Sequence, residues 1–360
     1  MAEREKSMKP TASATKYHIL TLNQISSHGL HRFPGARYTV GKAVEQPDAI
    51  LVRSHDMHQM AIPASVKAIG RAGAGTNNIP VAEMSKRGVP VFNAPGANAN
   101  AVKELVFASM LMAARNVVPA LGYTAGLRAD APDLEARVEE GKKQFSGVEL
   151  PNRTLEELLK QSDFVTLHVP LLPVTRHLID EKRLAALKPG AVLLNFARDA
   201  VVDETAVLAA LHAHRLKYYM CDFPSAKLLG ALGVVALPHL GASTEEAEEN
   251  CAVMVVDQVR EFLEHGTLAN SVNFPSVEMA RESPWRIAIA NANVPNMLGQ
   301  ISTTMAKAGL NIHNMVNKSR GEMAVTLVDV DSPIEDKVIE AIAAIEGVLS
   351  VRSIPATEAT

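Results

Sequence analysis

The chain has 360 residues, of which 47% are hydrophobic and 21% charged, and its formal net charge at pH 7 is -3. This length exceeds that of one typical domain and the composition is ordinary for a globular protein, so we expect two or three domains. The small net charge gives no electrostatic reason to expect nucleic acid or an anionic membrane surface as a partner.

The N-terminal segment 1–16 is polar and contains no apolar run of the kind a secretory signal needs, so we expect a disordered leader. The longest apolar stretch, 105–114, is shorter than the roughly 20 residues that span a bilayer, so a buried helix is expected there. Two cysteines, Cys221 and Cys251, fit a reducing compartment rather than a disulfide framework. We therefore expect a cytoplasmic protein without a membrane segment.

The first part of the chain alternates between strand-like and helix-like segments. Short apolar runs predict strands at 17–22, 49–52, 66–69 and 89–93, and helices are predicted at 81–87 and 100–116. This alternation is typical of the βαβ units of a parallel sheet. A first α/β domain is therefore expected at 17–122.

A second α/β unit follows a polar surface connection at 128–144. Strands are predicted at 163–170, 191–197, 217–223 and 234–238, with helices at 181–187 and 203–211. A long helix at 245–265 comes next, because its apolar residues recur at helical spacing. Ser243 and Thr244 precede it as caps, and Glu246 and Glu248 complement its positive N-terminal dipole.

The C-terminal part repeats neither pattern. After a linker at 270–284 we expect a strand at 285–291, a helix at 297–308, strands at 311–317 and 323–330, a helix at 334–344 and a strand at 348–354. The order βαββαβ is the ferredoxin-like arrangement.

Three segments at the ends of predicted strands contain chemically useful side chains. Arg198 and Arg53 can bind carboxylate or phosphate oxygens with two hydrogen bonds, and His239 has a titration range suited to removing a hydroxyl proton. The turn at 73–78 can offer backbone N–H groups to an anion. Singly, such residues are most often a solvated arginine, a structural histidine and an ordinary turn. Together they fall where open α/β sheets bind ligands.

Four stretches carry a resemblance to a known family. The run RAGAGTNNIPVAEMSKRGVPVFNAPGANANAVKELV (71–106) resembles the substrate domain of D-3-phosphoglycerate dehydrogenases. The stretches NFARDAVVDETAV (195–207), LPHLGAST (237–244) and NSVNFP (270–275) are similar to the same family, and the βαββαβ unit resembles its amino-acid-sensing ACT domain. The resemblance covers most of the chain.

The resemblance implies an α/β fold with three domains. A flavodoxin-like substrate-binding domain would cover 17–122 plus about 243–270, and a truncated Rossmann-type nucleotide-binding domain would cover 123–242. A ferredoxin-like α+β domain of the ACT type would cover 284–356. The implied reaction is hydride transfer between C2 of 3-phosphoglycerate and NAD, with no metal, in a homo-oligomer.

The same resemblance assigns roles to single residues. His239 would be the acid–base histidine and Arg198 the arginine that anchors the substrate. The implied substrate contacts are Arg53, Ser54, Ala74, Gly75 and Asn98. The implied cofactor contacts are His168, Val169, Pro170, Ala197, Asp222, Gly241 and Ala242. Asn293 and Asn311 match the positions that hold serine in the ACT domain.

One expected element is missing from the sequence. The family's G-x-G-x-x-G turn, which holds the pyrophosphate of NAD, should follow 150–154, but Thr154 runs directly into a helix-like segment. The only G-x-G pair, Gly73 and Gly75, has Asn78 where the third glycine belongs and no acid at 89–100 for the ribose. A βαβ unit of roughly 30 residues is therefore absent at 154/155, and we expect weak NAD binding and an exposed edge on the strand at 163–170.

A second departure concerns the partner of His239. The family usually places a glutamate in the loop after 217–223, but Asp222 is the only acid between Thr205 and Thr244. Asp222 can serve either the histidine or the cofactor.

Three explanations of the whole chain stay open: an active dehydrogenase, an oligomeric serine sensor or regulatory partner without catalysis, and an incomplete gene product.

Overall fold

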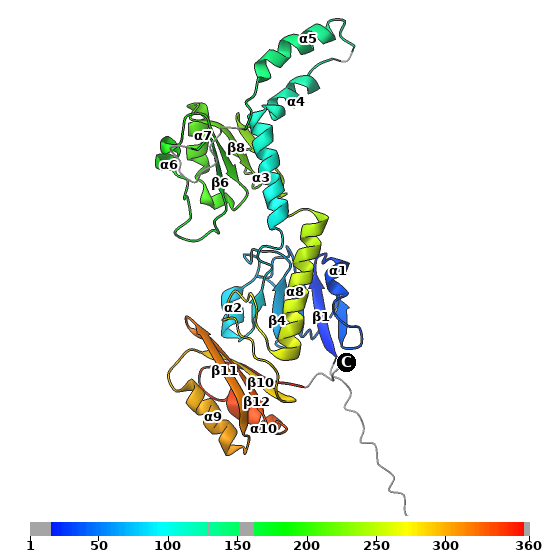
Figure 1. Cartoon of the computed structure of the whole chain (residues 1–360), viewed down its shortest axis with the longest axis vertical. Coiled ribbons are helices and arrows are strands. Elements are labelled where there is room, and N and C mark those ends of the chain that lie inside the picture. Colours follow the sequence, from blue (N-terminus) through cyan, green and yellow to red (C-terminus); the bar gives the residue numbers. More distant parts are fainter. Residues whose placement is uncertain (1–15, 129, 151–161, 356–360) are drawn as a thin grey trace, which may run out of the picture. The chain divides into compact units, whose positions relative to one another are not determined.

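The computed structural model describes residues 16–128, 130–150 and 162–355 (Figure 1). The expected leader at 1–16, except for its last residue, and the expected junction at 154/155 lie outside the described residues. The chain divides into two compact units, one made of Met1–Asn98 with Glu245–Thr360 and the other of Ala99–Thr244. Both cysteines are buried and free.

The first unit begins with a five-stranded parallel sheet of order β2-β1-β3-β4-β5. Its strands are β1 (Tyr17–Leu22), β2 (Tyr38–Gly41), β3 (Ala49–Val52), β4 (Ala68–Arg71) and β5 (Val91–Phe92). The helices are α1 (Ser27–Leu30), α2 (Val81–Lys86) and α8 (Glu245–His265). The sheet confirms the parallel α/β prediction, although β2 was not predicted, because its four residues have no clear alternation.

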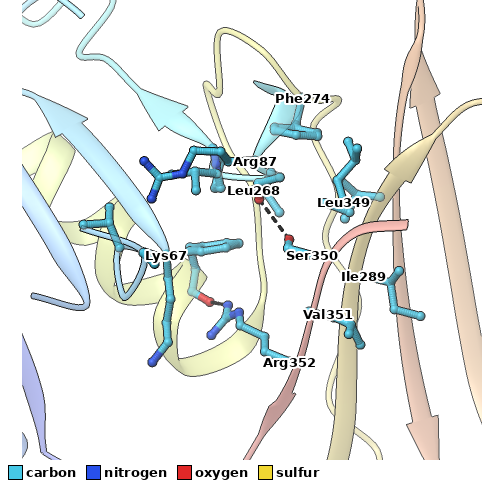
Figure 2. Close-up of a pocket in the computed structure, with 18 residues that line it drawn as sticks. Lys67, Arg87, Leu268, Phe274, Ile289, Leu349, Ser350, Val351 and Arg352 are labelled. Atoms are coloured by element: carbon cyan, nitrogen blue, oxygen red, sulfur yellow. Dashed lines mark hydrogen bonds between the residues drawn. The ribbon is translucent and has the colours of Figure 1, made fainter. Parts of the chain in front are cut away.

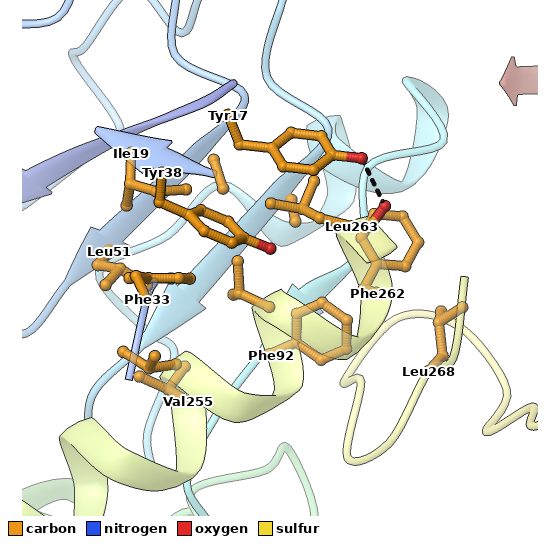
Figure 3. Packing of buried hydrophobic residues seen from close by; sticks show 14 of the residues in the cluster. Tyr17, Ile19, Phe33, Tyr38, Leu51, Phe92, Val255, Phe262, Leu263 and Leu268 are labelled. Atoms are coloured by element: carbon orange, nitrogen blue, oxygen red, sulfur yellow. Dashed lines mark hydrogen bonds between the residues drawn. The ribbon is translucent and has the colours of Figure 1, made fainter. Parts of the chain in front are cut away.

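Helix α8 returns from the far end of the sequence to close this sheet. Its predicted bounds, 245–265, are confirmed, and Val255, Val259 and Leu263 are completely buried. Burying each of these side chains contributes about 1.5–3 kcal/mol before entropy is counted. The Tyr17 hydroxyl donates a hydrogen bond of 3.0 Å to the Leu263 carbonyl at the end of the helix, as Figure 3 shows.

The same unit contains a four-stranded antiparallel sheet of order β11-β12-β10-β13. Its strands are β10 (Trp285–Ala292), β11 (Ile312–Arg320), β12 (Met323–Val330) and β13 (Val348–Ile354), and its helices are α9 (Met297–Lys307) and α10 (Asp336–Ala343). This is the predicted βαββαβ order, and we call it the ACT-like sheet. Asn296 precedes α9 with a φ of 62°, the left-handed conformation expected of an asparagine in that turn.

The second unit has a four-stranded parallel sheet of order β6-β7-β8-β9. Its strands are β6 (Phe164–Leu167), β7 (Ala191–Asn195), β8 (Leu216–Cys221) and β9 (Val234–Ala236). The helices are α3 (Ala99–Ala114), α4 (Val117–Ala125), α5 (Leu134–Gly141), α6 (Glu181–Ala186) and α7 (Glu204–His212), with short 3-10 turns η1 (Lys142–Phe145) and η2 (Asp199–Val201). Among the described residues β6 pairs only with β7, so it is an edge strand, and Phe164, Val165 and Leu167 in it are buried.

The boundary between the units differs from the expected end of the first domain near 122. Val106, Met110 and Ala113 of α3 form one hydrophobic cluster with Val192 and Leu194 of β7. Helix α3 therefore belongs with the second sheet, because its buried side chains pack there. The sequence was ambiguous at this point, since α3 is apolar on most of its surface and its pattern does not indicate which sheet it covers.

Among the described residues, no single helix has the length and hydropathy of a membrane span. Helices α3 and α4 reach these values only when they are taken together, and they are bent by 67° at the break between them.

Candidate active site

The carboxyl ends of the strands in the second sheet carry all the residues expected there. Because the four strands are parallel neighbours, their carboxyl ends lie at one edge of the sheet. The expected residues follow in strand order: His168, Val169 and Pro170 after β6, Ala197 and Arg198 after β7, Asp222 after β8, and His239, Gly241 and Ala242 after β9.

Arg198 is positioned by a buried asparagine at the end of β7. The side chain of Asn195 donates to the Arg198 carbonyl at 2.9 Å and accepts from the Ala197 N–H at 3.2 Å, which fixes the turn into η2. Arg198 is half-buried, and its Nη1 donates to the Ala197 carbonyl at 2.6 Å. A guanidinium has five N–H donors, so this bond leaves donors with which Arg198 can bind a carboxylate.

His239 is held mainly through its backbone. Its N–H donates to the carbonyls of Asp222 at 3.0 Å and Leu237 at 3.1 Å, and its φ of 52° is left-handed. The imidazole is exposed and lies against the ring of Phe223, with 4.6 Å between centroids. The ring is therefore oriented while remaining accessible to a substrate hydroxyl, as a general base requires.

Asp222 is completely buried at the end of β8. Its Oδ2 accepts the Gly241 N–H at 3.1 Å, while its Oδ1 has no hydrogen-bond partner. Burial raises the pKa of this carboxyl, and the bond from Gly241 and the nearby charge of His239 oppose the rise. A buried acceptor without a donor is costly, so Oδ1 is suited to a ligand that brings an N–H group.

The expected carboxylate partner of His239 is not formed here. Within the described ranges, no carboxylate oxygen lies within 4 Å of a ring nitrogen of His239, including those of Asp222. Ser225, near where the family has its glutamate, instead donates to Glu204 at 2.8 Å. The Asp222 carboxylate therefore bonds to Gly241 rather than to the His239 ring, and the His239 ring lies against Phe223.

The first unit holds the expected anion-binding residues at the ends of β3, β4 and β5. Arg53 and Ser54 follow β3, and the Asn23 side chain accepts the N–H groups of Ser54 at 3.2 Å and His55 at 2.6 Å. The Arg53 guanidinium pairs with Glu248 of α8 at 2.7 Å. No sequence pattern indicated this pairing, and a substrate anion would have to share Arg53 with that carboxylate.

The turn after β4 adds a residue that the motifs did not single out. Ala74 and Gly75 follow Gly73, whose φ of 147° suits only glycine, and a Cβ there would lie 1.6 Å from Nη1 of Arg71. The guanidinium of Arg71 therefore lies over the turn. Burial raises the pKa of the nearby Cys251 thiol, and the charges of Arg71 and Arg53 both oppose the rise. Nothing in the sequence set Arg71 apart from other arginines at strand ends.

The remaining expected residues, Asn98, Asn293 and Asn311, do not line one common cavity. Asn98 ends the first stretch of this unit and is half-buried. Asn293 lies in the turn before α9 and helps to line a cavity of about 210 Å³, where its side chain donates to the Gly321 carbonyl at 3.0 Å. Asn311 precedes β11 and is not among the residues that line that cavity. The ACT-like sheet thus presents Asn293, but not Asn311, to this hollow.

Of the parts of a nicotinamide dinucleotide, the second sheet offers a partner for the nicotinamide but not for the pyrophosphate. Its carboxamide N–H₂ could satisfy the unpartnered Oδ1 of Asp222. Its pyrophosphate would need free N–H groups at a helix N-terminus. The two helices that follow strands β6 and β7, α6 and α7, are capped by Asp180 and Asp203 and carry Glu181 and Glu204 in their first turns. Asp180 and Asp203 accept N–H groups of these first turns, and all four carboxylates repel an anion, so the described residues lack a pyrophosphate site.

Comparison with known proteins agrees with this geometry. Residues 131–241 match the family model described as D-isomer specific 2-hydroxyacid dehydrogenase, NAD binding domain. A D-3-phosphoglycerate dehydrogenase of Escherichia coli is 30% identical over 79% of this chain and 80% of its own length. A protein of the same name from Haemophilus influenzae is also 30% identical, over the same shares of the two chains.

Solved structures support the same fold. The crystal structure of the TT0316 protein from Thermus thermophilus has a TM-score of 0.55 at 25% identity and covers 71% of this chain and 99% of its own. A 3-phosphoglycerate dehydrogenase of Entamoeba histolytica, solved with NAD⁺ bound, has a TM-score of 0.54 at 23% identity, with coverage of 72% and 99%.

The alignment with the Escherichia coli relative contains positions that this chain lacks. It runs over 333 positions but uses only 79% of a 360-residue chain, so the relative has several tens of residues where this chain has none. The chain belongs to the NAD-dependent D-2-hydroxyacid dehydrogenase family, and its relatives at 30% identity are named D-3-phosphoglycerate dehydrogenases.

Proposed function

We propose that this chain oxidises 3-phosphoglycerate at C2 to 3-phosphohydroxypyruvate, the first step of L-serine biosynthesis. The observation that supports this most is the placement of Arg198 and His239 at the ends of β7 and β9, on the two sides of the buried Asp222. The names of the curated relatives favour the same substrate, and they give no support to a non-catalytic serine sensor.

The proposed chemistry needs an anchor, a base and an acceptor of two electrons. Arg198 binds the substrate carboxylate and polarises the oxygen on C2 as it becomes a carbonyl. His239 takes the proton of the C2 hydroxyl, and its accessible ring can return that proton in the reverse reaction. NAD, when bound, accepts the hydride from C2. Arg53 and Arg71 supply positive charge for the remaining anionic group of the substrate.

Substrate comparison tests this assignment. The full chain, assayed for NADH formation at high NAD concentration, should give a kcat/KM for 3-phosphoglycerate at least about tenfold above that for D-glycerate, which lacks the phosphate. Equal values for the two substrates, or no NADH from either, would contradict the proposal.

We also propose a homo-oligomer that forms through α3 and α4. Phe107 and Leu111 are 51% and 52% exposed and lie one turn apart on one face of α3, and Leu121 of α4 is 61% exposed. Exposed apolar side chains gathered on adjoining helices are typical of a protein interface, and a second copy would bury them.

Substitution of Leu111 by glutamate should shift the chain toward the monomer, because a carboxylate in an apolar interface loses its hydration. Light scattering after size exclusion would measure the mass of each variant. Val174→Glu, a change of the same kind at a loop residue that is 81% exposed, should keep the oligomer. A wild-type monomer, or an equal loss in both variants, would contradict the assignment.

The ACT-like sheet is proposed to bind L-serine at the cavity that Asn293 lines. The support is the resemblance of Asn293 and Asn311 to serine-binding positions and the asparagine-rich lining, which includes Asn291, Asn296 and Asn317. Calorimetry should show saturable L-serine binding that weakens about tenfold or more in Asn293→Ala, because the amide that would hydrogen-bond the charged groups of serine is removed. D-Serine is the control, and equal heats for the two enantiomers would argue against a specific site.

We place the enzyme in the cytoplasm, since both of its thiols are free and buried as expected in a reducing compartment. Microscopy of the chain fused to a fluorescent protein would test this location. Fluorescence in an oxidising compartment outside the cytoplasm would contradict it.

A further inference from the structure

A cavity of about 300 Å³ lies between the ACT-like sheet and the parallel sheet of the first unit, away from the residues of the candidate active site. One wall is formed by the turn after α2 and the end of α8. The other is formed by β10, β12 and β13 (Figure 2). Pockets that bind small molecules are commonly this large and are found between domains.

The walls of the cavity are mainly apolar. Leu268 and Phe274 line the first side and Leu349 lines the second (Figure 2). Phe262 and Val325 also line the cavity. A water-sized group occupies about 30 Å³ in a liquid, so the space holds roughly ten non-hydrogen atoms. A ligand of that size with an apolar body would bury most of its surface here.

The charged side chains that line the cavity are all positive. Lys67, Arg87 and Arg352 line it, and no aspartate or glutamate is among the described residues that do. Lys67 pairs with Asp48 at 2.6 Å, and Arg87 donates to two backbone carbonyls and lies 3.9 Å from Glu83. These two cations are therefore partly neutralised.

Arg352 differs from the other two cations. It donates to the carbonyls of Phe262 and, at 3.0 Å, Leu263, and it stacks on the Phe262 ring at 4.2 Å. In the part of the chain that the structure describes, no carboxylate lies within salt-bridge distance of it. Burial lowers the pKa of this guanidinium to about 10. The more distant Asp48 carboxylate opposes this effect of burial but makes no ion pair with Arg352. Two of the five donors of Arg352 are used by these carbonyls, so a guanidinium without a salt-bridge partner lines the cavity with donors to spare.

The two walls are fixed to each other across the cavity. The Ser350 hydroxyl donates to the Gly88 carbonyl at 3.0 Å (Figure 2). Gly88 has a φ of 68°, and a Cβ there would lie 2.5 Å from the Ser350 oxygen, so only glycine allows this approach. The site is therefore largely formed before a ligand arrives, which lowers the entropic cost of binding.

We propose that this cavity binds a small organic carboxylate with an apolar body, whose carboxylate pairs with Arg352 and whose body packs between Leu268 and Leu349. The apolar walls favour a single anionic group over a phosphate, which would need more polar partners. The unpaired cation favours an anion over a neutral ligand of the same shape. The site does not depend on the dehydrogenase reaction.

Titration of the full chain with octanoate, and with octanamide as its neutral counterpart, tests the proposal by calorimetry. Octanoate should bind saturably and at least about tenfold more tightly than octanamide, the difference expected for a charge-assisted pair. Methyl resonances of Val325 and Leu349 should shift as the site fills. No saturable binding of octanoate, or equal affinity for both compounds, would overturn the proposal.

Variants locate the binding. Ala290 lines the cavity, so Ala290→Leu should fill it and weaken octanoate binding at least about tenfold. Ala306→Leu, the same change at an exposed site on α9, should leave binding unchanged. Arg352→Gln should remove the preference for octanoate over octanamide. If that variant does not fold, Arg352→Lys serves in its place, and it should retain part of the preference. Unchanged binding in Ala290→Leu would place the ligand elsewhere and overturn the proposal.

Discussion

Replacement of Asp329 by asparagine should lower the free energy of unfolding of the first unit by about 3–5 kcal/mol, the cost of breaking a buried ion pair from one side. Asp329 of β12 lies opposite Arg286 of β10, and both side chains are completely buried. Their two parallel bonds measure 2.6 and 2.9 Å. Asparagine would leave the Arg286 charge unpaired in the protein interior.

The surroundings make this pair sensitive to the loss of a charge. The remaining donors of Arg286 reach the carbonyls of His265, Met279 and Ala280, so all five of its N–H groups are satisfied. The pair therefore ties the ACT-like sheet to the segment that follows α8. Unfolding in denaturant, followed by circular dichroism, would measure the change. Asp331→Asn, the same change at an exposed residue just beyond β12, should cost less than about 1 kcal/mol.

The same pair predicts a dependence on pH. Burial alone would raise the pKa of Asp329, but the bonds from Arg286 and the Glu282 N–H outweigh burial and hold it below its ordinary value. Its contribution is therefore complete above about pH 4, the value for an unfolded aspartate, and is lost as the pH falls through the lower folded pKa. The stability difference between the wild type and Asp329→Asn should shrink in that range. A difference below about 1 kcal/mol at neutral pH would contradict this role of the pair.

Replacement of His239 by glutamine should lower kcat for 3-phosphoglycerate oxidation by about 10²–10⁴-fold, the usual contribution of a positioned general base. Glutamine keeps a polar side chain of similar length but cannot accept the hydroxyl proton. The backbone bonds of His239 to Asp222 and Leu237 do not involve the side chain, so the loop should keep its shape. Initial rates at fixed NAD would measure the effect, and KM should change little.

A second histidine provides the control. His214 is exposed and also has a left-handed backbone, with a φ of 54°, but it precedes β8 at the opposite edge of the sheet. His214→Gln should leave kcat within about twofold of the wild type. A loss of less than tenfold in His239→Gln would show that another group takes the proton.

The sequence predicted the elements whose pattern is strong over many residues. Helix α8 and the βαββαβ order of the ACT-like sheet were both predicted, because helical spacing in α8 and the alternation of strands and helices leave one interpretation. The ends of the strands also indicated where the site residues lie, since loops at the carboxyl ends of parallel strands share one edge.

The contacts that tune these residues could not be predicted in the same way. The pairing of Arg53 with Glu248, and that of Arg286 with Asp329, joins residues far apart in sequence, and each depends on how two elements pack. Arg71 was missed because nothing distinguishes an arginine at a strand end until its guanidinium is seen over Gly73. The assignment of α3 to the second sheet depended on packing for the same reason.

The described residues include the candidate catalytic residues Arg198 and His239 at the ends of β7 and β9, but they lack a site for the cofactor's pyrophosphate. The sequence has no G-x-G-x-x-G turn, and the helices α6 and α7 of the second sheet begin with carboxylates. The buried Oδ1 of Asp222, at the carboxyl end of β8, has no hydrogen-bond partner in the described residues. Binding should therefore be weak even where the chemistry is intact, because the pyrophosphate contacts supply much of the affinity.

Calorimetric titration of NADH into the full chain tests this loss of cofactor affinity, with the Escherichia coli relative titrated in parallel. We expect no saturation of this chain at submillimolar NADH under conditions in which the relative saturates. Saturable binding with a micromolar Kd would contradict the loss of the pyrophosphate site.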